Sequence, residues 1–282
     1  MRARLGGFLL TILFSLLASF SAHADFEKAF CERLYDPNFL APLESPVEHG
    51  TDEIPTLKPG DEFSLLVWNL YKAKKRNFWR DFHTLTNSAD ISIFQESILS
   101  EESWEHLQAM EGVHWQSAMS FKMNDTKSTG LTTGSRFYVK GSEALASPVR
   151  EPIARTPKLS MISEIPIEGT DQSLMVVNIH AINFVRPSRF YMQLEMLIRK
   201  LEKHNGPLII AGDFNSHFFR DGILEQFRQR LNLELIVIEG DTRWFKFDRI
   251  YVRGLGWSNA EILKSIHTSD HKPLKLDLKV PE

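Results

Sequence analysis

The stretch that most constrains the fold is a short apolar segment that ends abruptly in polar residues. Leu208 to Gly212 reads Leu-Ile-Ile-Ala-Gly, and Asp213, Phe214 and Asn215 follow directly. A continuous apolar run of this kind is typical of a strand buried on both faces. In open α/β sheets, ligands bind beyond the carboxyl ends of such strands. The segment therefore predicts a buried strand with Asp213 and Asn215 at a ligand-binding edge, although Gly-Asp-x-Asn-Ser is also ordinary turn chemistry.

Other predicted strands also meet polar residues at their ends. All of these positions carry side chains able to bind metal or phosphate: predicted strands end at Asn69, Gln95-Glu96 and His180, Asp248 starts a predicted strand, and Asp270-His271 precedes the last one. Each residue has a structural explanation by itself, since asparagine is common in turns and glutamate is usually at the surface. A histidine after an apolar strand can equally be a hydrogen-bonded core residue. Together, however, these explanations require six coincidences of position, so we expect a functional site.

The bulk composition is that of a globular protein. The chain has 282 residues, enough for one large domain or two small ones, with 43% hydrophobic and 24% charged residues. Predicted strands outnumber predicted helices, and they occur both in pairs and in alternation with helices. This pattern favours an α/β (α+β) fold with a mixed sheet or two packed sheets flanked by helices.

The first 24 residues predict a signal peptide. Arg2 and Arg4 precede an apolar run from Leu5 to Phe20, and Ala22-His23-Ala24 fits a cleavage site. The run is short for an anchor helix, which needs about 20 apolar residues. We expect an exported protein, periplasmic or secreted, with no stable membrane anchor; without use of the signal it would be cytoplasmic. Cleavage would leave 282 − 24 = 258 residues and a formal charge of −3 − 2 = −5.

The mature chain is predicted to have two parts. Residues 25–59 are proline-rich and predict an extended segment, and residues 60–282 predict the folded domain. Cys31 is the only cysteine, so no intramolecular disulfide can form. Nothing in the sequence indicates a protein partner, and we expect a monomer.

Five motifs occur in a diagnostic order over residues 63–280. They are Trp68-Asn69, Gln95-Glu96, Gly212-Asp213-Phe214-Asn215, Asp248-Arg249-Ile250 and Ser269-Asp270-His271. This ordered set resembles the endonuclease/exonuclease/phosphatase superfamily, which includes DNase I, exonuclease III-type nucleases, neutral sphingomyelinases and inositol polyphosphate 5-phosphatases. Residues 66–72 and 176–184 look most similar to its YafD-like bacterial branch. The resemblance implies a DNase I-like four-layer α/β/β/α sandwich.

The resemblance also implies a magnesium-dependent reaction, with Mn²⁺ as a substitute metal. Magnesium is usually bound by one or two carboxylates together with waters and substrate phosphate. Glu96 is the first candidate for a metal ligand, with Asn69 close to the same ion and Asp270 as an additional ligand.

Roles for the remaining motif residues follow from the same resemblance. Asp213 would orient or deprotonate the attacking water, and Asn215 would help hold that water and the phosphate. His271 would contact the phosphate or act as a base, with Asp248 fixing its tautomer. His180 would contact phosphate or assist the leaving group. Two further residues, Arg136 and Lys72, are candidates for substrate phosphate binding.

The expected activity is hydrolysis of phosphodiester bonds, first of all by a DNase-like nuclease. Basic residues near the predicted site, in 72–76 and at Arg186 and Arg189, suit a phosphate backbone, although a charge near −5 does not suggest a general nucleic-acid binder. Trp244 and Phe245 could stack on a base, lie against a lipid or belong to the core. The alternatives are a sphingomyelinase-type lipid phosphodiesterase, an inositol-phosphate phosphatase and, in another class, a non-catalytic binding protein on the same scaffold.

Overall fold

The computed structural model describes residues 46–50, 54–152, 155–216 and 220–282. The predicted signal peptide, Cys31 and most of the predicted extended segment 25–59 lie outside these residues. Within the described part of the chain, no helix has the length and hydropathy needed to cross a bilayer.

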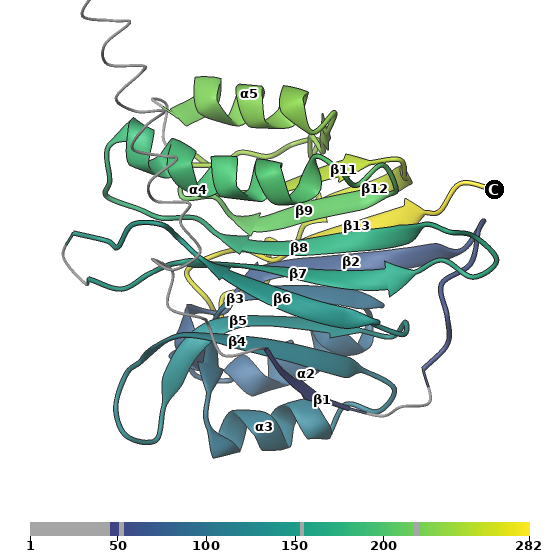
Figure 1. Ribbon diagram of the computed structural model, residues 1–282. Helices are drawn as coiled ribbons and strands as arrows, with labels where there is room; N and C mark the ends of the chain where they lie inside the picture. The colour runs from purple at the N-terminus through teal and green to yellow at the C-terminus, as the bar shows by residue number, and fades with distance from the viewer. Residues whose placement is uncertain (1–45, 51–53, 153–154, 217–219) are drawn as a thin grey trace, which may run out of the picture. The chain divides into compact units, whose positions relative to one another are not determined.

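Two sheets form the centre of the fold (Figure 1). The first has seven strands in the order β1 (Val47–His49), β4 (His114–Lys122), β5 (Ser128–Ser135), β3 (Ile91–Leu99), β2 (Glu62–Asn69), β13 (Leu274–Lys279) and β12 (Gly256–Ile262). The second has six, in the order β10 (Glu234–Leu235), β11 (Asp248–Arg253), β9 (Leu208–Asp213), β8 (Ser173–His180), β7 (Leu159–Pro166) and β6 (Gly141–Ala146).

Each sheet contains one parallel pair among antiparallel neighbours. The parallel pairs are β2 with β3 in the first sheet and β8 with β9 in the second. The carboxyl ends of two parallel neighbours lie at the same edge of a sheet, which is where ligands bind in α/β folds. Both pairs end in residues of the predicted site.

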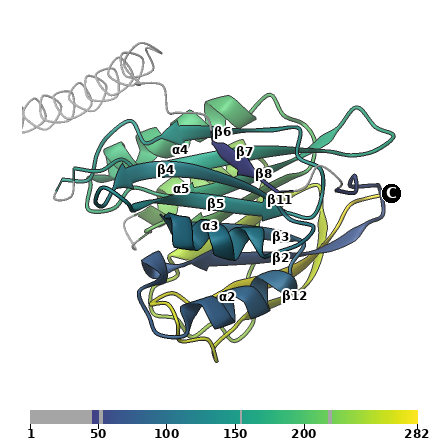
Figure 2. The ribbon, with the colours of Figure 1, turned by 90° about the horizontal axis from the view of Figure 1, so that it is seen from below.

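Helices cover the outer face of each sheet. α4 (Pro187–Leu201) and α5 (Asp221–Arg230) lie over the second sheet, and α2 (Phe78–Asn87) and α3 (Glu101–Gln108) lie over the first (Figures 1 and 2). The 3₁₀ turn η1 (Tyr71–Ala73) follows β2. The layers therefore run helix, sheet, sheet, helix, which confirms the predicted α/β/β/α sandwich.

Apolar burial holds these layers together. Leu65 and Ile93 from one sheet and Val176 and Ile209 from the other share the core between the sheets. On the outer side, the stripe of Phe190, Leu194, Leu197 and Leu201 on α4 is buried against the second sheet. The helical spacing of that stripe is the pattern expected for a helix with one buried face. Packing on both faces keeps β8 and β9 rigid up to the residues where they end.

Candidate active site

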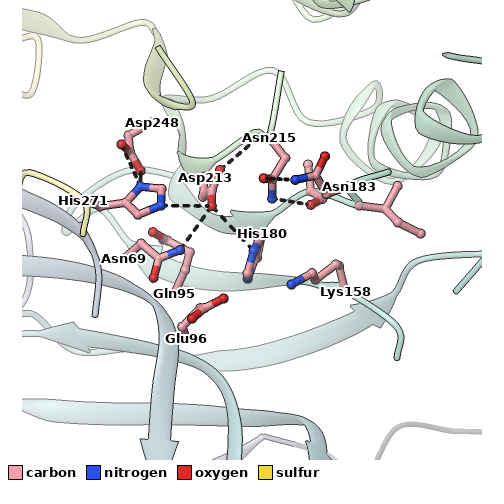
Figure 3. Close-up of polar contacts among 12 residues, drawn as sticks. Asn69, Gln95, Glu96, Lys158, His180, Asn183, Asp213, Asn215, Asp248 and His271 are labelled. Atoms are coloured by element: carbon pink, nitrogen blue, oxygen red, sulfur yellow. Dashed lines mark hydrogen bonds and ion pairs between the residues drawn. The ribbon is translucent and has the colours of Figure 1, made fainter. Parts of the chain in front are cut away.

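Asp213 lies at the centre of the polar side chains that the strand ends bring together (Figure 3). It pairs in register with His180 of β8 on one side and with Asp248 of β11 on the other. Across the two sheets, the Asn69 side-chain amide donates a hydrogen bond to Asp213 Oδ2 at 3.1 Å. The ends of β2 and β8 and the start of β11 therefore meet at one carboxylate.

The Asp213 carboxylate is buried, with only 2% of the residue exposed. Its Oδ1 accepts the backbone N–H of Asn215 at 2.8 Å, which fixes the rotamer. Its Oδ2 faces His180 Nε2 at 3.6 Å and His271 Nε2 at 3.9 Å. One carboxylate oxygen is thus held by the backbone while the other faces two imidazoles.

Gly212 lets β9 approach its neighbours closely at this point. Its φ is +140°, and a Cβ there would lie 2.1 Å from the carbonyl oxygen of Ile179 in β8 and 2.9 Å from Nε2 of Gln95. Only glycine adopts this conformation without strain. Any other residue would push β9 from β8 and move Asp213 away from His180.

The surroundings of Asp213 raise the pKa of its carboxyl group. Burial is the main cause, and the nearby Asp248 carboxylate adds to it; His271, the backbone N–H of Asn215 and Asn69 act in the opposite direction. The pKa of Asp213 rises to about 6. At neutral pH the group is ionised yet basic enough to accept a proton.

His271 is held by a carboxylate. Its Nδ1 lies 2.8 Å from Asp248 Oδ1, and Asp248 is held in turn by Arg243, whose Nη1 donates to Oδ2 at 3.1 Å. Burial by itself would lower the pKa of His271, but the Asp248 and Asp213 carboxylates outweigh it and raise the pKa to about 9. The imidazole is therefore protonated at neutral pH, and its Nε2–H faces Asp213.

His180 has the opposite protonation state. Burial lowers its pKa well below the ordinary value, and the positive charges of Lys158, His271 and Lys72 lower it further. The imidazole is neutral, so its 3.6 Å approach to Asp213 is not an ion pair.

Asn215 is tied to the protein by both ends of its amide. Its Nδ2 donates to the Ala181 carbonyl at 2.9 Å, and its Oδ1 accepts from Asn183 Nδ2 at 2.8 Å. The backbone of Asn215 has a φ of +46°, a conformation that asparagine adopts more readily than most residues. Asn215 therefore joins the segment after β9, next to Asp213, to the segment after β8.

Glu96 lies on the opposite, more open side of the site. A bulge between Phe94 and Ser97 interrupts the pairing of β3 with β5, and Glu96 has a φ of +49°. Bulges of this kind redirect a side chain near a functional site. The Glu96 carboxylate forms an ion pair with the ammonium group of Lys72.

A cleft of about 200 Å³ opens beside this ion pair. Its lining includes Lys72, Glu96, Lys158 and His180. The Glu151 carboxylate also lines the cleft, and each ammonium is paired with a carboxylate, Lys72 with Glu96 and Lys158 with Glu151. The cleft therefore offers ammonium groups to an anion and carboxylates to a cation.

The donor set fits a magnesium ion that keeps several of its waters. Among the described residues, no three His, Cys, Asp or Glu side chains form a metal-binding group. Magnesium does not require such a cage, because one carboxylate with waters and substrate phosphate is enough. Glu96 supplies that carboxylate beside open space, whereas Asn69 Oδ1 already accepts the backbone N–H of Tyr71 at 3.1 Å.

Asp270, predicted as an additional metal ligand, lies next to His271 on the turn before β13. It is exposed, and its carboxylate accepts a hydrogen bond from the Ser269 hydroxyl at 3.3 Å. Ser269 also donates to the Asn69 carbonyl at 2.6 Å, which attaches the Asp270–His271 turn to the end of β2.

The prediction of Arg136 as a phosphate-binding residue at this site was wrong. Arg136 follows Ser135, which pairs with Ile91 at the start of β3, whereas the site residues Gln95 and Glu96 lie in the middle of that strand. Its guanidinium donates to the backbone carbonyls of Ala89 and Glu111. Arg136 therefore links the segments that follow α2 and α3 to the end of β5.

Lys72, by contrast, lies where a phosphate-binding residue is expected. It lines the cleft next to Glu96, and its backbone has a φ of +55°, within a run of left-handed residues at Tyr71 to Ala73.

Two contributors, Lys158 and Asn178, were missed from the sequence. Lys158 lines the cleft and pairs with Glu151 at 3.6 Å, but it stands in a stretch with no motif. Gln95 and Asn178 are fully buried and joined across the two sheets by a 2.8 Å hydrogen bond. The available signal for this bridge was a single amide, Asn178, inside an otherwise apolar strand.

Comparisons with known proteins agree with this geometry. A family model described as the Endonuclease/Exonuclease/phosphatase family matches residues 66–271. A UPF0294 protein of Vibrio campbellii is 32% identical over 222 residues, 76% of each chain. This similarity agrees with the predicted YafD-like branch.

Solved structures share the fold at low identity. An endonuclease/exonuclease/phosphatase from Beutenbergia cavernae has a TM-score of 0.64 at 13% identity, over 78% of this chain and 72% of that chain. The human Nocturnin catalytic domain, with a bound sulfate anion, has a TM-score of 0.57 at 16% identity, over 83% and 97%.

Proposed function

The chain belongs to the Endonuclease/Exonuclease/phosphatase family, and from this premise we propose that it catalyses metal-dependent hydrolysis of phosphodiester bonds, as a DNase-like nuclease. The observation that carries the proposal is the Asp213 carboxylate, buried and fixed by hydrogen bonds between a neutral and a protonated imidazole. That arrangement suits transfer of a proton from water while negative charge develops nearby.

Asp213 is the group that accepts the proton of the attacking water. Its pKa near 6 keeps it ionised at neutral pH and matches the task of a general base. The hydrogen bond from Asn69 and the backbone N–H of Asn215 hold the carboxylate in one orientation, so no reorganisation is needed when the proton moves.

His271 supplies a positive charge beside the reacting phosphate. Its pKa near 9 keeps it protonated, and Asp248 holds its ring so that Nε2–H faces the site. A fixed cationic donor stabilises the charge that develops on phosphate oxygens in the transition state. His180 stays neutral and can donate or accept one hydrogen bond at the leaving-group oxygen.

The cleft side of the site would hold the phosphate and the metal. Lys72 and Lys158 attract the anion, and Glu96 would hold Mg²⁺. When bound, the metal neutralises charge on the phosphate oxygens. The sulfate in the Nocturnin neighbour supports an anion-binding site on this scaffold.

A substrate panel tests the proposal. Plasmid DNA, a chromogenic phosphodiester, sphingomyelin and an inositol phosphate are incubated with Mg²⁺ and with a chelator. We expect magnesium-dependent cleavage of DNA and of the chromogenic diester, and a loss of about 10²–10⁴-fold in Asp213→Asn. Asp221→Asn, which changes an exposed carboxylate on α5, is the matched control.

Other outcomes would contradict parts of the proposal. Equal activity of Asp213→Asn and wild type would remove the catalytic assignment. Cleavage of sphingomyelin or inositol phosphate without cleavage of DNA would replace the nuclease by one of the other members of the family. Turnover of no substrate would favour a non-catalytic binding protein.

A further inference from the structure

Two large aromatic side chains near the site are exposed to solvent. Trp244 is 81% exposed and Phe184 is 69% exposed. Burying an aromatic side chain stabilises a fold, so leaving one in solvent forgoes that contribution. The proposed hydrolysis does not use either ring.

Trp244 stands in a loop that is fastened to the active site. The neighbouring Arg243 guanidinium bonds to Asp241 and to Asp248, the residue that holds His271. The backbone N–H of Phe214 donates a hydrogen bond to the carbonyl oxygen of Phe247 at 2.8 Å. The backbone around Trp244 is therefore anchored to the end of β9 while the indole remains in solvent.

Phe184 stands in a second anchored loop. It follows Asn183, whose side-chain amide donates to Asn215 at 2.8 Å. The backbone N–H of Phe184 donates to Asn183 Oδ1, and Phe184 has a φ of +54°. A bulky residue in this left-handed conformation is uncommon and costs energy, which makes a functional reason worth seeking.

The two rings approach the catalytic groups from different elements. Trp244 precedes β11 and reaches the site through Arg243 and Asp248, whereas Phe184 follows β8 and reaches it through Asn183 and Asn215. Asp213 pairs with both of these strands. A phosphate bound at Asp213 would thus lie between two loops, one carrying Trp244 and the other carrying Phe184.

Cations accompany the aromatic residues. Lys74 and Lys75 follow β2 and are exposed, and Lys75 Nζ donates to the Ser269 carbonyl at 2.8 Å beside the His271 turn. Lys246 lies two residues after Trp244 with half of its side chain exposed. Aromatic rings that stack on bases, together with cations that follow the backbone, are how proteins bind single-stranded nucleic acid.

We propose that Trp244 and Phe184 stack on the bases that flank the scissile phosphate of a single-stranded nucleic acid. This inference rests on the proposed function and specifies its substrate class. In a duplex the base faces are covered by their neighbours, so exposed rings would have nothing to stack on. A bilayer surface fits less well, because Arg243 and Lys246 interrupt the apolar character around Trp244 and polar catalytic groups separate the two loops.

Oligonucleotide binding tests the inference directly. A labelled oligo-dT and a duplex of equal length are titrated by fluorescence anisotropy against the full chain carrying Asp213→Asn, which prevents turnover. We expect tighter binding of the single strand, and a loss of about 5- to 100-fold on adding Trp244→Ala or Phe184→Ala. Trp257→Ala is the control, because this 38% exposed tryptophan lies on β12 and bonds to Glu234.

The same variants in the active background give a second readout. The ratio of kcat/KM for the oligonucleotide to kcat/KM for the chromogenic diester falls in Trp244→Ala and stays at the wild-type value in Trp257→Ala.

Unchanged oligonucleotide affinity in both aromatic variants would overturn the inference, as would a preference for the duplex. Trp244-dependent binding to phosphatidylcholine–sphingomyelin vesicles in place of oligo-dT would also overturn it. If wild type still cleaves the chromogenic diester and Asp213→Asn does not, only the base-stacking inference is wrong and the proposed hydrolysis stands. If wild type cleaves no diester, the proposed hydrolysis is wrong as well.

Discussion

Two sides of the site carry charge, and they are held differently. On one side, Asp213 and Asp248 are at most 7% exposed, and each carboxylate accepts hydrogen bonds from fixed groups. On the other, the Glu96 and Lys72 side chains are 19% and 17% exposed, and they pair with each other beside open space. The first side is complete within the protein. On the second side, the Glu96 carboxylate can release Lys72 to bind a cation, and the Lys72 ammonium can release Glu96 to bind a phosphate.

This difference separates two tasks. Proton transfer benefits from groups that do not move, because reorganisation during the reaction costs energy. Binding of a cation and a phosphate requires groups that the ligands can reach. Glu96 and Lys72 both have left-handed backbones, at φ values of +49° and +55°, so the surrounding structure holds even the open side in place. The site combines a preorganised half with an exchangeable half.

The largest effect is expected from damaging the buried half without touching Asp213. Asp248→Asn removes the charge that holds His271 protonated, so kcat/KM should fall by about 10²–10⁴-fold. The alkaline limb of the pH profile should also move from about 9 toward the ordinary histidine value. A purely structural role for Asp248 would lower activity without moving that limb.

The second effect concerns stability. Because the pKa of Asp213 is about 6 in the folded chain and ordinarily 3.8, the folded state binds more protons between these values. The contribution of Asp213 to the free energy of unfolding should therefore fall as pH rises from 4 to 6, by an amount on the order of 3 kcal/mol. The contribution of His180 rises over the same range, because burial lowers its pKa. Urea titrations should therefore show that stability gains less, or loses more, with rising pH in wild type and Asp221→Asn than in Asp213→Asn. Equal slopes in all three would show that Asp213 is not the group responsible.

A smaller effect should appear on the open half. Lys72→Met removes the ammonium that competes for the Glu96 carboxylate, so Mn²⁺ should bind about 2- to 5-fold more tightly, as expected for a partly exposed ion pair. Isothermal titration calorimetry measures this affinity without turnover. Lys74→Met is the control, since Lys74 lies over the Tyr71 ring on the same loop. An unchanged Mn²⁺ affinity in Lys72→Met would mean that Glu96 does not bind the metal.

The smallest catalytic effect is expected at Arg136. Arg136→Lys cannot reproduce both backbone hydrogen bonds, so the free energy of unfolding should fall by about 1–2 kcal/mol. The kcat/KM should stay within about twofold of wild type, because the residue lies beside the start of β3, away from Gln95 and Glu96. A larger loss of kcat/KM at unchanged stability would restore its role in phosphate binding.

Much of the fold could be predicted from the sequence because apolar runs and polar strand ends are local patterns. The run at Leu208–Gly212 identified β9. The order of the motifs supplied the architecture, which no single segment determines. Asp213, His180, His271 and Asp248 were found because they follow or begin strands whose ends meet.

The remaining parts depend on tertiary contacts that leave little local signal. Arg136 was misplaced because a serine–arginine pair after a strand looks the same at either end of a sheet, and only the register with β3 distinguishes the two. Lys158 was missed because its proximity to the site comes from a loop folding back beside β5. The Gln95–Asn178 bridge joins residues 83 positions apart, so no spacing rule could reveal it.

The pH dependence of kcat/KM for a chromogenic phosphodiester, at saturating Mg²⁺, shows whether Asp213 acts as the base beside a protonated His271. A base with the pKa of Asp213 and an acid with that of His271 give a bell-shaped profile that rises through about pH 6 and falls through about pH 9. The residual activity of Asp213→Asn should lack the acidic limb. Wild-type kcat/KM that is flat between pH 5 and 7, or an acidic limb retained in Asp213→Asn, would contradict this role of Asp213.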